Sequence, residues 1–178
     1  MTLRTRSKLV ATAVALLVAG GTAVVAGVAV AAGAAGTAKG AVTYKARGAP
    51  VTVALKHAWL VKGPDAVDPK KIVRKLILSA DDIGAKIAAC RTMSCVDADL
   101  NSGMTVDFDA GPRLNYWIVL DNQRVQYSGT AAPAAFKAAA DTATRLAGKL
   151  VIDDTKAGGP GIDVQFDTPL AAELKAAR

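Results

Sequence analysis

The chain has 178 residues, 52% of them apolar and only 4% aromatic, and carries a net charge of +7 at pH 7. Once a targeting segment is set aside, the remaining length suits a single domain. Scarce aromatic residues and scattered basic residues provide neither a stacking platform nor a basic stripe, so the composition argues against a nucleic-acid partner.

Residues 1–36 have the pattern of an export segment. Arg4, Arg6 and Lys8 precede an uncharged run from Leu9 to Ala38 that consists mostly of Ala, Val, Leu and Gly. A basic start followed by an apolar run and small residues is typical of a secretory signal, and this run is also long enough to span a bilayer. The sequence therefore predicts a periplasmic or secreted protein. Residues 1–36 are either a cleaved signal peptide or an uncleaved N-terminal helix that anchors the chain in the inner membrane, the only membrane contact expected.

Residues 37–50 lack periodicity and are predicted to be a linker, so the exported domain spans residues 51–178. Apolar side chains alternate from Val51 to Val61, which predicts a half-buried strand, and a second strand is expected over Ile72–Leu78. Ser79 followed by acids indicates a helix start, so one short helix is expected near residues 80–90.

The rest of the domain reads as further short strands. The stretch 131–140 is ambiguous between helix and strand, and we favour a strand there. About seven short strands at regular spacing predict a mainly β protein, an antiparallel β-sandwich or barrel. The other strand candidates are Met104–Phe108, Leu114–Leu120, Val125–Tyr127, Leu146–Ile152 and Ile162–Phe166.

Two stretches, Leu55–Asp65 and Gly111–Trp117, resemble an uncharacterised family of small secreted or periplasmic proteins of Gram-negative bacteria. The resemblance covers most of the exported part and implies export. It implies no activity and no cofactor.

Cys90 and Cys95 are the only cysteines, and export would place them where disulfides persist. We therefore predict a disulfide between them. The alternative is a site for a soft metal ion built from Cys90, Met93 and Cys95, since three sulfur ligands suit an ion such as Cu(I).

Asp97, Asp99 and Asn101 begin like a calcium loop, with oxygen ligands at alternate positions. The pattern then departs from such a loop, because its sixth position is Ser102 instead of Gly and its twelfth is Phe108 instead of Glu. An acidic turn that enters a strand is the preferred interpretation, and a bound metal is the alternative.

A hairpin supplies the candidate binding surface: Asn115, Trp117, Arg124, Gln126 and Tyr127. Strand alternation places Trp117 on the face opposite Tyr116 and Leu114. Core packing of Trp117 is the preferred interpretation, and an exposed aromatic beside amide and guanidinium groups, as on a recognition surface, is the alternative.

No nucleophile motif appears, and Asp107 with Asp109, on one face of a strand, are expected to face solvent. The sequence thus favours an exported, non-enzymatic β-sandwich protein with a binding or structural role in the cell envelope, its partner an unknown envelope protein or ligand. A periplasmic metal-binding protein is the alternative, and an envelope hydrolase without a recognisable motif comes third.

Overall fold

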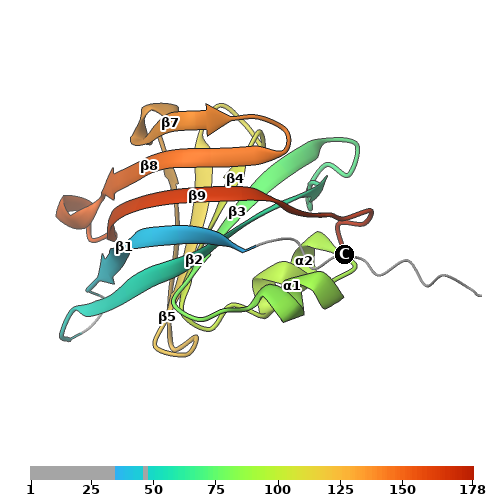
Figure 1. The fold of residues 1–178 in the computed structure, drawn as a ribbon. Coiled ribbons are helices and arrows are strands. Elements are labelled where there is room, and N and C mark those ends of the chain that lie inside the picture. The colour runs from blue at the N-terminus through green and yellow to red at the C-terminus, as the bar shows by residue number, and fades with distance from the viewer. Residues whose placement is uncertain (1–34, 46–47) are drawn as a thin grey trace, which may run out of the picture.

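The structure, a computed structural model, describes residues 35–45 and 48–178 (Figure 1). The predicted signal or anchor segment lies outside these residues, apart from its last two positions. Within the described ranges, no helix is both long enough and apolar enough to cross a membrane.

The described chain forms nine strands, two short helices and two single turns of 3₁₀ helix. The strands are β1 (Gly36–Tyr44), β2 (Val51–Pro64), β3 (Ile72–Ser79), β4 (Gly103–Phe108), β5 (Leu114–Leu120), β6 (Val125–Ala131), β7 (Phe136–Asp141), β8 (Arg145–Asp153) and β9 (Gly161–Glu173). The helices are α1 (Gly84–Ala89) and α2 (Met93–Ala98), and the 3₁₀ turns are η1 (Pro133–Ala135) and η2 (Thr155–Ala157).

All nine strands belong to one sheet in the order β6-β5-β4-β3-β2-β1-β9-β8-β7. Neighbouring strands in this order are antiparallel, and the end of β9 also pairs with β2 in parallel. The sheet curls into a half-barrel, so that β4 and β5 cross steeply behind β7, β8, β9 and β1 (Figure 1).

The long strand β2 explains why one sheet forms instead of a sandwich of two. Its first half, from Val51 to Ala58, pairs with β1, whereas its second half, from His57 to Pro64, pairs with β3. A strand that belongs to both halves makes the corner through which a sheet folds back on itself. The mainly β, antiparallel prediction is confirmed. The structure has nine strands where about seven were expected.

The interior of the half-barrel is a packed apolar core. Each half contributes alternate residues of its strands, as a half-buried strand does. Among the fully buried members are Leu60, Leu76, Met104, Ile118, Leu146, Leu150 and Val164.

A second apolar cluster lies on the outer face, where α1 and α2 cover β2 and β3. Trp59 and Ile77 come from the strands, Ile87 and Val96 from the helices, and Leu174 from the chain end that follows β9. Figure 1 shows both helices on one side of the sheet, with the C-terminus beside them.

Two local predictions are corrected by the structure, and an ambiguous one is decided. The range 37–50 is not simply a linker, because it contains most of β1, which pairs on both sides, with β2 and with β9. The helix near residues 80–90 begins only at Gly84, because the Ser79 hydroxyl bonds to the backbone of Asp81 while Asp82 accepts the N–H of Gly84. The strand favoured for the ambiguous stretch 131–140 is present in its second half: Ala131 ends β6, η1 follows, and residues 136–140 belong to β7.

Candidate binding surface

Three of the five predicted binding residues, Asn115, Trp117 and Gln126, meet on the outer face of the β5–β6 hairpin. Trp117 is paired with Ser128 and Asn115 with Thr130, and paired residues of antiparallel strands share a face. The next pair, Val119 with Gln126, continues the same face. We call Asn115, Trp117, Gln126, Ser128 and Thr130 the β5–β6 strip.

The hairpin turn is stabilised by its own sequence and by the loop after α2. Asp121, Asn122 and Gln123 have φ values of 50°, 53° and 69°, a region that Asp and Asn tolerate better than most residues. The Gln123 N–H donates to the carbonyl of Asn101 at 3.1 Å, and its side-chain amide donates to the carbonyl of Leu100 at 3.2 Å. These bonds tie the end of the hairpin to the helical cover.

Trp117 lies at the margin of the helical cover. It is half-buried and packs against the outer apolar cluster, whereas the other four members of the strip are exposed. The structure therefore combines the two interpretations of Trp117, because one part of the indole packs and another faces solvent. The strip itself carries no charge, and Arg113 at its end bonds to the Thr130 hydroxyl at 2.9 Å.

Two of the predicted surface residues lie elsewhere. Arg124 is in the turn, exposed and 4.0 Å from the carboxylate of Asp121. Tyr127 faces the interior, where its ring lies 5.2 Å from the ring of Tyr44 and 6.1 Å from that of Tyr116. The strip is thus made by Asn115, Trp117 and Gln126 of the predicted set, without Arg124 or Tyr127.

The interior tyrosines hold the two halves of the sheet together. The Tyr116 hydroxyl donates to Asp154 at 2.5 Å, which connects β5 with the loop that follows β8. Burial, followed by the hydrogen bond to the Asp154 carboxylate, raises the pKa of Tyr116 well above its ordinary value. This tyrosine therefore stays protonated and acts as a structural donor.

A buried lysine lies on the same outer face as the strip, two strands away. Lys75, Asp107 and Asn115 are successive partners in register across β3, β4 and β5. Lys75 is 8% exposed, and its Nζ donates to both carboxylate oxygens of Asp97 at 2.7 and 2.6 Å. This ion pair fastens α2 to the sheet.

Asp107 interacts more weakly with Lys75 than Asp97 does. Its Oδ1 is 3.5 Å from the Lys75 Nζ and has no hydrogen-bond partner among the described residues. Burial raises the pKa of Asp107, and Lys75 opposes the shift only partly. The group lines a cavity of about 100 Å³ together with Asp65, Val73 and Met93.

Asp107 and Asp109 do not share a face, contrary to the expectation from alternation. Asp109 lies beyond the end of β4 with a φ of 67°, and its carboxylate binds the guanidinium of Arg74. Arg74 also binds Asp141, at the end of β7. The lysine Lys75 was missed because it interrupts an apolar run, and only the cover by α2 makes it buried.

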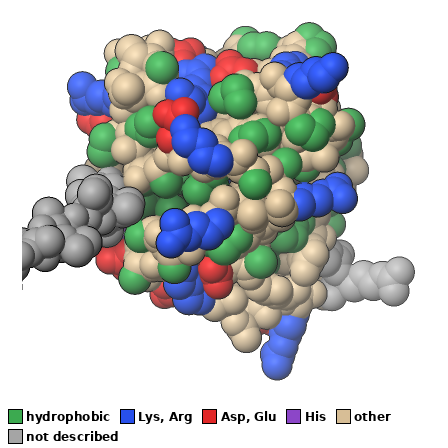
Figure 2. All heavy atoms as spheres, turned by 90° about the vertical axis from the view of Figure 1, so that its right-hand side faces the viewer, with side chains coloured by type: hydrophobic (Ala, Val, Ile, Leu, Met, Phe, Trp, Pro, Cys, Tyr) green, Lys and Arg blue, Asp and Glu red, His purple; other side chains and the backbone are tan. Residues whose placement is uncertain are grey.

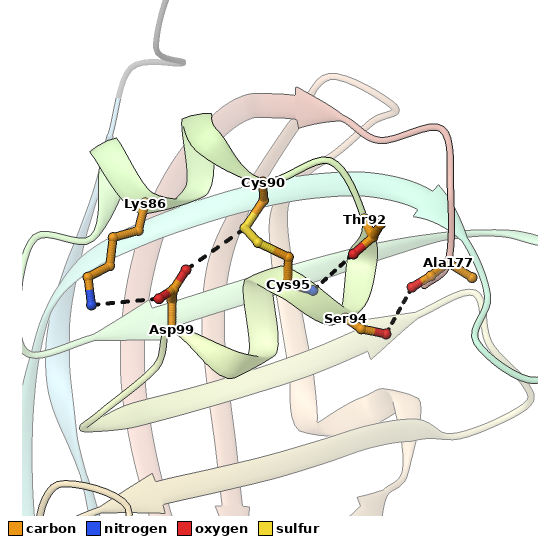
Figure 3. The surroundings of a disulfide bond; sticks show 7 residues. All are labelled: Lys86, Cys90, Thr92, Ser94, Cys95, Asp99 and Ala177. Atoms are coloured by element: carbon orange, nitrogen blue, oxygen red, sulfur yellow. Dashed lines mark hydrogen bonds and ion pairs between the residues drawn. A yellow bond between two sulfur atoms is a disulfide. The ribbon is translucent and has the colours of Figure 1, made fainter.

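The predicted disulfide is present between Cys90, which ends α1, and Cys95 in α2 (Figure 3). Figure 3 also shows Asp99 beside it, with one oxygen 4.0 Å from the Cys90 Sγ and the other 3.7 Å from the Lys86 Nζ. Met93 is buried in the outer cluster. Because the two sulfur atoms are bonded to each other, neither is a thiolate ligand in this state.

The calcium-like loop is not gathered around one point. Asp97 binds Lys75, whereas Asp99 lies beside the disulfide. The Asn101 side-chain oxygen accepts from the amide of Gln123 at 3.4 Å. Each of the three oxygen groups thus has a protein partner of its own.

Charge is dispersed on the face of the molecule that Figure 2 presents. Lys and Arg side chains lie singly among acidic and apolar side chains, without a joined basic patch. The fold and the strip together define a small, disulfide-containing, single-sheet β protein with helical cover on one face. No known protein family, curated protein or solved structure matches this chain.

Proposed function

We propose that the protein is exported and acts without catalysis in the cell envelope, by binding an uncharged, hydroxyl-rich ligand of the saccharide class on the β5–β6 strip. One observation carries the proposal: a half-buried indole, that of Trp117, stands among exposed side chains that are all neutral amides or hydroxyls. The apolar face of a sugar ring packs on such a ring, and its hydroxyls suit groups that both donate and accept.

The rigidity of the strip supports this proposal. The indole of Trp117 is held by the outer cluster, and the hairpin is tied to the loop after α2 through Gln123. A surface whose side chains are already ordered loses less entropy on binding. The Lys75 ammonium and the Asp97 carboxylate, in contrast, are already paired with each other within the protein.

Export is supported by the basic and apolar pattern of residues 1–36 and by the Cys90–Cys95 disulfide. Cleavage of the leader and its retention as an anchor are the two predicted outcomes. The mass of the protein purified from cells decides between them, since cleavage after a small residue removes about 30 residues and an anchor retains Arg4, Arg6 and Lys8.

Tryptophan fluorescence tests the binding proposal directly, because only one of the two tryptophans is accessible. Trp59 is 0% exposed, so acrylamide quenching reports on Trp117. A neutral N-acetylglucosamine oligomer or a neutral glucan oligomer is expected to protect Trp117 from acrylamide. Absence of protection by both oligomers, at millimolar concentration, would overturn the saccharide assignment.

A matched pair of variants localises the effect. Gln126→Ala removes an exposed amide from the strip and is expected to weaken the oligomer affinity about fivefold, as the loss of a hydrogen bond of about 1 kcal/mol does. Gln165→Ala removes an exposed amide from β9, in the other half of the sheet, and is expected to leave the affinity unchanged. Equal effects of both variants would contradict a site on the strip.

Metal binding remains the second candidate, supported by a single observation. Ligand atoms of Cys90, Cys95 and Asp99 lie within 4.8 Å of one another. A metal there requires the disulfide to be reduced, so the proposal predicts stoichiometric Cu(I) only in protein kept under reductant. Elemental analysis of the reduced and the oxidised protein tests it, and reduced protein without copper would exclude it.

A further inference from the structure

Strand β6 is a free edge of the sheet that lacks the usual protection. It stands at one end of the strand order, and within the described chain its only extensive contacts are with β5. Its seven residues, Val-Gln-Tyr-Ser-Gly-Thr-Ala, contain no charge and no proline, and all seven pair with β5 without a bulge. A regular, uncharged edge is a template for another strand.

The opposite edge, β7, carries the protection that β6 lacks. It contains Lys137 and Asp141, and its pairing with β8 is interrupted by a bulge between Ala138 and Ala140. Charges and bulges are the devices by which soluble proteins prevent edge pairing. The contrast within one sheet indicates that β6, unlike β7, is left free for pairing.

We propose that β6 pairs with β6 of a second copy of this chain, antiparallel and centred on Ser128. A two-fold axis at this residue brings Ser128 opposite the partner's Ser128, and Gln126 opposite the partner's Thr130. On the inner face it brings Tyr127 opposite the partner's Gly129. No pair along the strand sets like charges against each other, and a hydroxyl pair such as that of Ser128 with its symmetry mate is favourable.

The inner face beside Gly129 is covered by the Tyr116 ring of the same chain. A Cβ at position 129 would lie 2.5 Å from the Tyr116 hydroxyl oxygen, so this position is restricted to glycine within its own chain. Tyr127 already stacks near Tyr116 on the same inner face. In this register the partner's Tyr127 approaches the Tyr116 ring that covers Gly129, so aromatic rings of the two copies meet on the inner face.

The size of the edge sets the expected affinity. Seven paired residues make a ladder of roughly 24 Å, and such an interface buries less than the roughly 1,200 Å² of a standard stable complex. We therefore expect a reversible dimer with a dissociation constant in the roughly micromolar range. The dimer would place two β5–β6 strips side by side, but the inference does not depend on what the strips bind.

Single cysteines test the register. Ser128→Cys places two thiols opposite each other, and directly opposed Cα atoms about 4.5–5.5 Å apart are within disulfide range. This variant is expected to form covalent dimers on mild oxidation. Gln126→Cys alone is not expected to form covalent dimers, because residue 126 of the partner lies four residues further along the ladder. A mixture of Gln126→Cys and Thr130→Cys proteins is expected to cross-link.

Non-reducing electrophoresis reads the result cleanly, because the chain's only two cysteines, Cys90 and Cys95, are bonded to each other. Cross-linking of Ser128→Cys that does not exceed that of Gln126→Cys would overturn the register.

Sedimentation velocity of the unmodified protein tests the dimer itself, between about 1 and 200 µM, a range that brackets the expected affinity. Ser128→Lys places a charge in the middle of the edge and is expected to keep the protein monomeric, whereas Ala139→Lys on β7 is expected to leave the dimer intact. Circular dichroism of both variants is the control for folding. A wild-type protein that stays monomeric over this whole concentration range would refute the proposal, and β6 would then be free to bind a peptide from another protein instead. The same sedimentation coefficients for both lysine variants would also refute it.

Discussion

Removal of the disulfide is the perturbation whose effect follows most directly from the structure. The bridge joins the residue that ends α1 to the third residue of α2, at a sequence separation of 5. For a closed loop this short, the chain-entropy relation gives about 2 kcal/mol. We expect Cys90→Ala/Cys95→Ala to lower the free energy of unfolding by that amount, because the unfolded chain gains conformational freedom.

The loss is expected to be local. In the variant, α2 is still held by the Thr92 hydroxyl, which accepts the N–H of Cys95, and by the Ser94 hydroxyl, which donates to the Ala177 carbonyl (Figure 3). The ion pair of Lys75 with Asp97 remains as well. The helical cover therefore stays in place, and the denaturant m-value should not change.

Chemical denaturation at pH 7 measures this effect, with calorimetry as a second assay. For a domain of this size, about 2 kcal/mol corresponds to a melting temperature lower by roughly 6–10 °C. A reductant should lower the stability of the wild type to that of the double variant and leave the variant itself unchanged. A wild type insensitive to reductant, or a variant as stable as the wild type, would refute the reasoning.

Three further changes test other parts of the structure. Asp107→Asn is expected to become more stable relative to the wild type as the pH rises above about 4. Burial raises the pKa of Asp107, so the folded wild type holds this proton more tightly than the unfolded chain does. The wild type therefore loses stability as the carboxyl ionises beside Lys75, and the asparagine variant does not. Parallel stability curves of both proteins between pH 3.5 and 7 would contradict this. Tyr116→Phe should cost about 1–2 kcal/mol in urea unfolding, since it leaves Asp154 without its donor, and an unchanged midpoint would show that the bond is dispensable. Gly40→Ala should cost about 3 kcal/mol, because its φ is 152° and the new Cβ would lie 2.1 Å from a backbone oxygen of β9; a melting temperature equal to that of the wild type would exclude this close approach.

The strands found from the sequence are those whose neighbours barely affect their pattern. Leu114–Leu120 alternates as predicted, with one side chain in two facing the inner core. In β2 the predicted alternation holds only from Val51 to Leu55. Beyond it Ala58 and Leu60 face the inner core while Trp59 and Val61 face the outer cluster, so four consecutive residues are buried. Strand β1 was missed because Gly36, Ala38 and Gly40 give it little apolar contrast. Its stability comes from pairing on both sides and from the close approach of β9 at Gly40, which the local sequence does not reveal.

The sequence likewise predicted some features of the candidate site and missed others. Alternation correctly placed Trp117 opposite Tyr116, and the predicted bridge between the only two cysteines is confirmed. The sequence did not reveal that Tyr127 faces the interior while Gln126 stays on the strip, because an irregular turn precedes them. Burial of Lys75 was equally hidden, since it depends on α2, which follows about 20 residues later.

The sequence by itself determined which face each residue of the regular strand β5 occupies, and that Cys90 and Cys95 lie close enough to bond. These are local properties, set by a repeat of two residues and by a short loop. Only the tertiary structure decided that β2 bends one sheet into a half-barrel, that α2 buries Lys75, and that β6 remains an unprotected edge. Strand order and edges arise from contacts between distant segments, and no local pattern specifies which strand will lack a neighbour.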